Sequence, residues 1–103
     1  MLLFQRKEFA APATHLEKAI GLGLDDARLH NFLGICYSQT SRLQSAINSY
    51  RRALKLDPDL ADAHLNLAYA LQRTGAATEA QQEYRAACRL ETKYCMYVPK
   101  GNR

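Results

Sequence analysis

The 103-residue chain is 48% hydrophobic and 23% charged, a composition that is typical of one globular domain and excludes an intrinsically disordered protein. No apolar run reaches the length that crosses a membrane, and the opening MLLFQRKEF is too short in apolar content for a secretory signal. The formal net charge of +4 is modest and does not by itself indicate an anionic partner.

Three cysteines, Cys36, Cys88 and Cys95, are widely spaced and form no CxxC pair. This odd and scattered set predicts neither a disulfide framework nor a zinc site. A reducing, cytoplasmic compartment is the simplest expectation. Cys95, in the C-terminal tail, is the cysteine that we expect to be an exposed thiol.

Residues 1–26 predict one helix that follows a fragment of another. Proline is tolerated in the first turn of a helix but not beyond it, so Pro12 places the start of this helix near residues 8–11. Residues 1–5 would form only the stub of an earlier helix. The apolar residues that fit a buried helical face are Phe9, Leu16, Ala19 and Ile20.

Two amphipathic helices are predicted next, over residues 27–39 and 42–56. In each, apolar residues recur at the i, i+3, i+4, i+7 spacing of a helix with one buried face. Pro58 ends the second helix, because proline disfavours helical backbone at the residue before it. The two stripes are Leu29, Phe32, Leu33, Cys36 and Tyr37, and Leu43, Ala46, Ile47, Tyr50, Ala53 and Leu54.

A further pair of helices follows the proline. Asp59 is placed to cap a helix, Gly75 breaks the pattern, and residues 77–90 form the next helix. The apolar stripe of the first helix in this pair consists of Leu60, Leu67, Ala68 and Leu71.

The C-terminal residues 91–98 favour a short final helix, with a disordered tail as the alternative. Tyr94, Tyr97 and Val98 would share one face of that helix. The residues that this face would cover are Ala77, Ala80, Tyr84 and Cys88.

The two helix pairs are near-copies with a period of 34 residues. His30-x-x-Leu33-Gly34-x-x-Tyr37 aligns with His64-x-x-Leu67-Ala68-x-x-Leu71, and the same offset maps Ala46 onto Ala80, Tyr50 onto Tyr84, Ala53 onto Ala87 and Ser41 onto Gly75. A glycine inside a helix costs about 1 kcal/mol relative to alanine. We therefore expect Gly34 and Ala68 to meet Ala46 and Ala80 where the helices of each pair cross closely.

These residues resemble the tetratricopeptide repeat, whose signature is W-x2-L-G-x2-Y…A-x3-F…P. The second unit matches at Leu33, Gly34, Tyr37, Ala46, Tyr50, Ala53 and Pro58, with His30 in place of the aromatic residue. The third unit matches at Leu67, Ala68, Ala80, Tyr84 and Ala87, and departs from the signature at Leu71 and Thr92.

The resemblance implies an all-α fold, a tetratricopeptide-repeat α-solenoid of antiparallel helix pairs. It would contain about two and a half repeats and a short C-terminal capping segment. Residues 1–103 would form a single domain, made of a partial repeat 1–26, repeats 27–60 and 61–94, and a cap or tail 95–103. Stable arrays generally need at least three units, so marginal stability or self-association is expected.

In this family the first helix of each unit lines a concave groove that binds peptides and partner segments. Asparagine can bond both donors and acceptors of an extended peptide backbone, and apolar positions can hold its side chains. Ordinary solvent-facing residues are the alternative. The groove positions implied here are Arg28, Asn31, Ile35, Ser38, Gln39, Asp62, Leu65, Asn66, Tyr69, Gln72 and Arg73. The clamp that some members use for acidic chaperone tails is not matched, since only Asn66 agrees with it.

Basic residues form a stripe on the second helices, on the expected convex side. The stripe would suit nucleic acid or an anionic membrane surface. We favour a different explanation, in which cations complement the negative ends of the helix dipoles, because aspartates near the helix starts show the mirror pattern. No aromatic residues interleave with the stripe, which further disfavours single-stranded nucleic acid. The stripe consists of Arg51, Arg52, Lys55, Arg85, Arg89 and Lys93.

No catalytic, cofactor or metal site is predicted. His30 and His64 occupy the same repeat position, where a packed and hydrogen-bonded histidine is expected, whereas metal ligands must converge on one point. No glycine-rich phosphate loop is present. The sequence therefore predicts a module without enzyme activity that mediates protein–protein interaction and binds a peptide or partner protein segment in its concave groove. The alternative is a structural unit that stacks its repeats end to end into a homo-oligomer.

Overall fold

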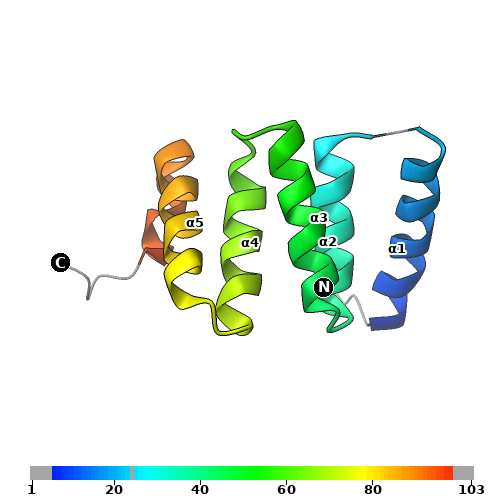
Figure 1. The fold of residues 1–103 in the computed structure, drawn as a ribbon, viewed down its shortest axis with the longest axis horizontal. Helices are drawn as coiled ribbons and strands as arrows, with labels where there is room; N and C mark the ends of the chain where they lie inside the picture. Colours follow the sequence, from blue (N-terminus) through cyan, green and yellow to red (C-terminus); the bar gives the residue numbers. More distant parts are fainter. Residues whose placement is uncertain (1–5, 24, 99–103) are drawn as a thin grey trace.

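The computed structural model describes the backbone of residues 6–23 and 25–98, and side chains within this part from Ala13 onward. These residues form five α-helices and one 3-10 helix, with no strand among them. Figure 1 shows the helices in chain order from α1 to α5 along the long axis of the molecule. The elements are α1 (Arg6–Gly21), α2 (Ala27–Gln39), α3 (Leu43–Leu56), α4 (Ala61–Arg73), α5 (Ala77–Leu90) and the 3-10 helix η1 (Thr92–Tyr97).

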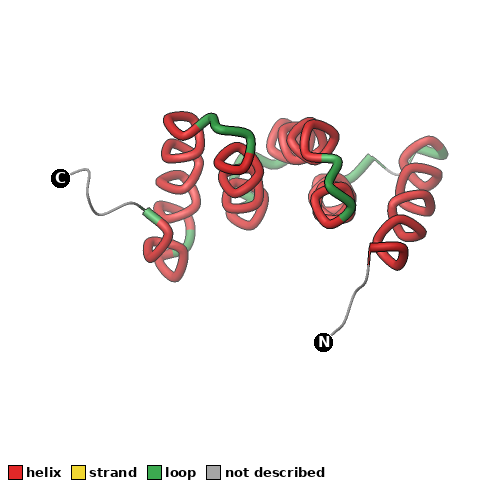
Figure 2. The backbone as a smooth tube through the Cα atoms, turned by 90° about the horizontal axis from the view of Figure 1, so that it is seen from below, coloured by secondary structure: helices red, strands yellow, loops and turns green. Residues whose placement is uncertain are grey.

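The helices pack as consecutive antiparallel pairs. α2 packs on α3 and α4 packs on α5, while α1 lies against α2, and α3 joins the two pairs by packing on α4 (Figure 2). Every boundary of α4 and α5 falls 34 residues after the matching boundary of α2 and α3. The all-α helical-repeat fold predicted from the period is thus confirmed.

The tight turns inside the two pairs also match. Ser41 and Gly75, which are equivalent under the repeat, both adopt positive φ, at 65° and 90°. The residue after each of them donates a backbone hydrogen bond to the preceding helix: Arg42 N–H donates to the carbonyl of Tyr37, and Ala76 N–H donates to the carbonyl of Leu71. The same local backbone therefore reverses the chain in both pairs.

The main core lies between the two pairs and within each of them. Its buried residues come from α3, α4 and α5, and small alanines alternate in it with large side chains. A smaller cluster of Ala13, Leu33 and Cys36 joins α1 to α2. The main cluster consists of Ala46, Ile47, Tyr50, Leu67, Ala68, Ala70, Leu71, Ala80 and Tyr84.

The side chain that fills the space beside Gly34 is Tyr50, not Ala46 as the sequence suggested. A Cβ built on Gly34 would lie 2.4 Å from Cε1 of the Tyr50 ring, 2.6 Å from Cδ1 and 2.9 Å from Cζ. The ring is itself buried, with 2% of its surface exposed. Gly34 is therefore required because an aromatic ring of α3 lies directly on its backbone.

Three local expectations from the sequence are wrong. Helix α1 begins at Arg6, before the predicted start at residues 8–11, so Pro12 lies in its second turn. Helix α4 has Leu60 and not Asp59 at its N-cap, without a side-chain cap, while the backbone N–H of Asp59 donates to Asp57. The Phe32 side chain, predicted to lie in the apolar stripe of α2, is 54% exposed. The proposed stub at residues 1–5 lies outside the described residues.

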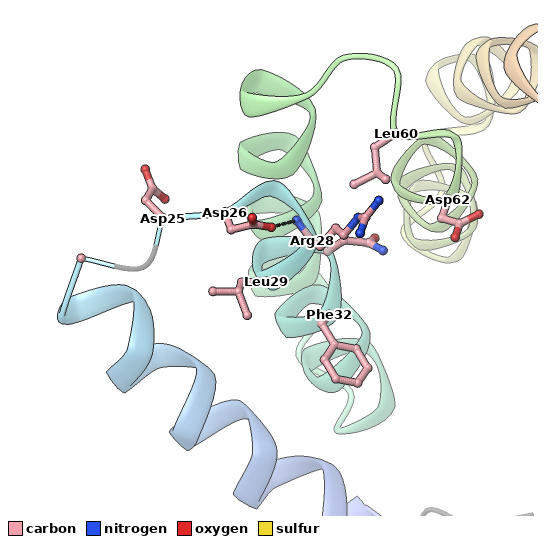
Figure 3. Close-up of a pocket in the computed structure, with 9 residues that line it drawn as sticks. Asp25, Asp26, Arg28, Leu29, Phe32, Leu60 and Asp62 are labelled. Carbon is pink, nitrogen blue, oxygen red and sulfur yellow. Dashed lines mark hydrogen bonds between the residues drawn. The ribbon is translucent and has the colours of Figure 1, made fainter.

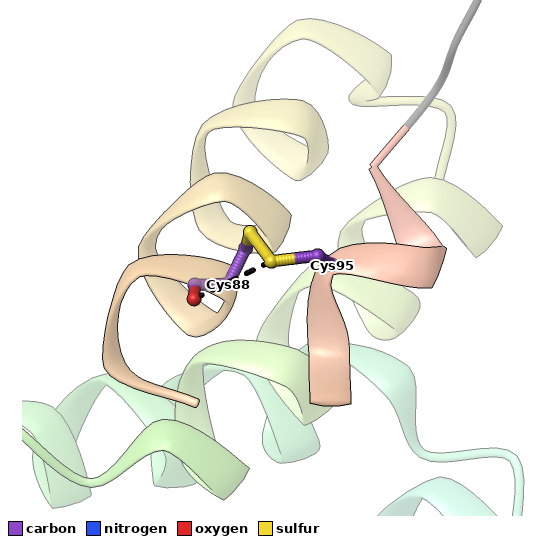
Figure 4. The surroundings of a disulfide bond; sticks show 2 residues. All are labelled: Cys88 and Cys95. Carbon is purple, nitrogen blue, oxygen red and sulfur yellow. Dashed lines mark hydrogen bonds between the residues drawn. A yellow bond between two sulfur atoms is a disulfide. The ribbon is translucent and has the colours of Figure 1, made fainter. Parts of the chain in front are cut away.

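A disulfide joins Cys88, near the end of α5, to Cys95 in η1, so the prediction that no disulfide forms is wrong (Figure 4). The turn between the two helices brings their Cα atoms to 4.4 Å. Cys36 is a free, buried thiol whose pKa is raised by burial. The cytoplasmic location that was inferred from the cysteine spacing stays a prediction.

The short final helix is a 3-10 helix that packs on α5. The Tyr97 ring stacks on the Tyr84 ring with centroids 6.2 Å apart, and Val98 packs against the main core. Ala77, which this helix was predicted to cover, is exposed. η1 thus covers the C-terminal half of α5 and leaves its first turn open.

Candidate functional site

The α2–α4 face is the surface formed by side chains of the two first helices. An amide–amide hydrogen bond joins these helices across the face, from Nδ2 of Asn66 to Oδ1 of Asn31 at 3.0 Å. Each asparagine is half-buried, and this bond uses one donor of Asn66 and one acceptor of Asn31. The remaining amide groups are the polar centre of the face.

Two cavities open on this face, one on each side of the asparagine pair. The larger, of about 790 Å³, lies between the α1–α2 loop and the starts of α2 and α4 (Figure 3). It is lined by Gly23, Asp25, Asp26, Arg28, Leu29, Asn31, Phe32, Leu60 and Asp62. The smaller, of about 270 Å³, is lined by Leu65, Asn66, Tyr69, Tyr84 and Tyr97.

Six of the eleven groove residues expected from the sequence line these cavities. Arg28, Asn31 and Asp62 line the larger cavity, and Leu65, Asn66 and Tyr69 line the smaller one. Tyr69 is the most open aromatic residue of the smaller cavity, with 55% of its surface exposed.

The other five residues line neither of these two cavities. Ile35 packs against the main core, and the side-chain oxygen of Gln72 accepts a hydrogen bond of 2.7 Å from the Tyr84 hydroxyl. The Arg73 guanidinium lies 5.7 Å from the centre of the Tyr69 ring, at cation–π distance. Ser38 is half-buried and Gln39 exposed.

Eight lining residues were not among the groove residues expected from the sequence: Gly23, Asp25, Asp26, Leu29, Phe32, Leu60, Tyr84 and Tyr97. The repeat period contains a signal for Phe32, because it lies 34 residues before Asn66, which was selected. Tyr97 could not be found in this way, since it belongs to η1, which lies outside the repeat. Its presence means that the C-terminal segment forms part of the face.

η1 also bonds directly to the first turn of α4. The Tyr94 hydroxyl donates to the Asp62 carboxylate, and this hydrogen bond, followed by burial, raises the pKa of Tyr94 to about 12. Tyr94 is therefore protonated and able to donate a hydrogen bond throughout the physiological pH range.

A second tyrosine hydroxyl bonds to a carboxylate between α1 and α2. Burial and a hydrogen bond to Glu17 of α1 raise the pKa of Tyr37 to about 12.

The carboxylate of Asp25, in the α1–α2 loop, accepts hydrogen bonds from two basic side chains. Asp25 accepts from Nε2 of His30 at 2.7 Å and from Nη2 of Arg52 at 2.5 Å. The hydrogen bond from His30 has the largest effect on the pKa of Asp25, followed by the bond from Arg52, and both lower this pKa.

A second ion pair joins Arg51 to Glu79 of α5 at 2.7 Å. Two arginines of the basic stripe, Arg51 and Arg52, are therefore already paired with carboxylates of this chain.

His64 contacts acceptors with both ring nitrogens. Nδ1 lies 2.7 Å from Oε1 of Glu83, and Nε2 lies 2.8 Å from the carbonyl oxygen of Pro58. Only the imidazolium form can donate from both nitrogens at once. The Glu83 carboxylate accordingly raises the pKa of His64, against the opposing effect of partial burial.

This geometry predicts a pH-dependent contribution of His64 to stability. Because the folded-state pKa lies above the unfolded value, the contribution is complete below about pH 6.5 and is lost as the pH rises through the folded pKa. We expect Glu83→Gln to lower the His64 pKa in an NMR titration and to reduce the fall in melting temperature between pH 6 and pH 8. An unchanged His64 titration in that variant would show that Glu83 is not the partner.

His30 and His64 are thus packed, hydrogen-bonded residues of the repeat, as their equivalent positions predicted. No group of three histidine, cysteine or acidic side chains that could hold a metal ion occurs in the described part of the chain. No helix within residues 6–23 and 25–98 is long and apolar enough to span a membrane.

The stacked antiparallel helix pairs, related by a 34-residue period, define the class of α-solenoid repeat proteins. Two family models agree with this class: a TPR repeat model matches residues 37–75, and a tetratricopeptide repeat model matches residues 61–94. The chain belongs to the tetratricopeptide repeat family, whose repeats are generally scaffolds for protein–protein interaction.

Among curated proteins, the chain is 30% identical over 80 residues to the peroxisomal targeting signal receptor of Saccharomyces cerevisiae, an alignment that covers 78% of this chain and 13% of the receptor. It is also 30% identical over 69 residues to protein O-mannosyl-transferase F38B6.6 of Caenorhabditis elegans, with coverage of 67% and 10%. The chain therefore spans only about one seventh or less of the length of these relatives.

Among solved structures, a crystal structure of MamA superimposes with a TM-score of 0.76 at 22% identity. The match covers 84% of this chain and 54% of MamA. This likeness supports the fold alone.

Proposed function

We propose that the chain is a binding module that holds a peptide or an extended segment of a partner protein on the α2–α4 face. The observation that carries the proposal is the pair of cavities on either side of the Asn31–Asn66 hydrogen bond. Amide groups with unused donors and acceptors can bond a peptide backbone, and the cavities on both sides can hold its side chains. The relative named as a targeting signal receptor agrees with a role in recognising a short segment.

The proposed role is binding without catalysis. The histidines that would serve as general bases, His30 and His64, are held by Asp25 and by Glu83 and the Pro58 carbonyl. The α2–α4 face instead offers amide, aromatic and aliphatic groups beside a few charged side chains, a mixture that suits recognition of a protein segment. A partner made of protein therefore fits the face better than a small substrate.

A random peptide library displayed on phage tests the proposal. Peptides selected on the wild-type chain should bind the Asn31→Ala/Asn66→Ala double variant and the Tyr69→Ala variant at least tenfold more weakly. Removing both asparagines together leaves neither partner of their mutual bond unpaired. Arg85→Glu, on the exposed side of α5, is the control and should bind as the wild type does.

Two results would overturn the proposal. One is a selection that enriches no peptide above the level of an unrelated helical protein. The other is a set of peptides whose affinity for both face variants equals that for Arg85→Glu. Circular dichroism of each variant separates lost binding from lost folding.

A further inference from the structure

Apolar side chains of α2 form one wall of the larger cavity and are open to solvent. The repeat-equivalent positions on α4 are not open in this way. Phe32 is 54% exposed, and Leu29 lies beside it on the same cavity wall (Figure 3). The residues of α4 that correspond to them under the repeat are Ala63, which is fully buried, and Asn66, which bonds to α2.

The equivalent position on α4 indicates what kind of structure can pack against Phe32. On α4, the corresponding position is covered by the first helix of the preceding pair, which is α2. On α2, the same position faces the larger cavity instead. In the geometry of this array, the object that lies against that position is a helix.

The charges around the cavity favour a cationic occupant. Three of its lining residues are aspartates and one is an arginine, Arg28, although the whole chain carries a net charge of +4. Asp25 is already held by Arg52 and His30. Among the described residues, Asp26 accepts only a backbone N–H and Asp62 only the Tyr94 hydroxyl, so neither carboxylate has a cationic partner.

We infer that the larger cavity binds an amphipathic helix of a partner protein, with its apolar side on Phe32, Leu29 and Leu60 and with lysine or arginine beside Asp26 and Asp62. The inference deepens the proposed function and rests on it, because Arg28, Asn31 and Asp62 belong to both. A helix laid in an apolar groove is a common mode of recognition, and complementary charge sets its orientation and its rate of binding.

A designed peptide provides the probe. It is a 15-residue helix-forming peptide with leucine and phenylalanine on one face and lysine elsewhere, labelled for fluorescence anisotropy. Two controls accompany it, one with glutamate at every lysine and one interrupted by a central proline, which breaks a helix. The lysine peptide should bind at least tenfold more tightly than either control.

Matched variants locate the binding. Phe32→Ala should weaken binding of the lysine peptide at least tenfold, whereas Gln82→Ala, at an exposed residue of α5 outside the α2–α4 face, should leave it unchanged. Asp26→Asn/Asp62→Asn should weaken binding several-fold and reduce its salt dependence, since asparagine still caps α2 and still accepts from Tyr94. Loss of binding in Tyr69→Ala but not in Phe32→Ala would overturn this inference and leave the proposed function standing.

Other occupants are recognised by their own results. A concentration-dependent dimer in sedimentation that disappears in Phe32→Ala would assign the cavity to a second copy of the chain. Tighter peptide binding after deletion of residues 1–5 would assign it to the N-terminal segment of the same chain. Equal binding of the lysine and glutamate peptides would remove the electrostatic argument. Each of these outcomes overturns the inference.

Discussion

Gly34→Ala is expected to destabilise the chain by about 2 kcal/mol, although alanine is the better helix former by about 1 kcal/mol. The added Cβ would lie 2.4 Å from the Tyr50 ring, and a buried ring held between α2 and α4 has no open space to enter. Overpacking therefore outweighs helix propensity. Urea unfolding followed by circular dichroism measures the difference in the free energy of unfolding.

Gly21→Ala is the matched control, because a Cβ at this helical glycine meets nothing within 4 Å. It should be neutral or more stable by up to about 1 kcal/mol. A second change, Tyr50→Leu, should couple to Gly34→Ala, so that the double variant is more stable than the sum of the single effects predicts. Gly34→Ala at or above wild-type stability would show that the ring does not confine this position.

Breaking the Cys88–Cys95 disulfide is expected to lower the free energy of unfolding by about 2 kcal/mol, the value of the chain-entropy model for so short a loop. The loss should concentrate in η1 and the end of α5, because repeat arrays unfold locally from their ends. Hydrogen exchange of Cys95→Ser should show faster exchange near residues 88–98 and little change in α2 and α3.

Wild-type protein treated with a dithiol should behave like Cys95→Ser, whereas Cys95→Ser itself should not respond to the dithiol. A thiol assay on unfolded protein should find one free cysteine before reduction, Cys36, and three after it. Three free thiols in protein that was purified without reductant would contradict the bond.

The repeat period determined most of what the sequence could predict about the fold. Helix bounds at 27–39 and 77–90 agree with α2 and α5, because a 34-residue match constrains both copies at once. Helix α1 has no complete partner copy within the chain, and its start was misplaced. The prediction relied there on the local effect of Pro12 alone, which tertiary packing can override.

The disulfide was missed for a geometric reason. In an uninterrupted helix, residues seven apart lie about 10 Å apart along the axis, too far for a disulfide. The helix ends at Leu90, and the turn into η1 brings the two Cα atoms to 4.4 Å. Nothing in the spacing of the cysteines encodes that turn.

The candidate site was predictable only in part, for a related reason. Periodicity places Phe32 with Leu29 and Leu33 on an apolar face, but it does not say whether a neighbour covers that face. The family pattern selected Asn31 and Asn66, which the structure joins by a hydrogen bond. It could not select Tyr97, which reaches the smaller cavity from outside the repeat.

The two adjacent arginines of α3 hold carboxylates in opposite directions along the array. Arg51 reaches forward to Glu79 of α5, and Arg52 reaches back to Asp25 before α2. Both pairs are exposed, and exposed ion pairs contribute little to stability and are screened by salt. These two ion pairs therefore offer little resistance to a change in the curvature of the solenoid, and the buried core shared by α3, α4 and α5 is what holds its shape.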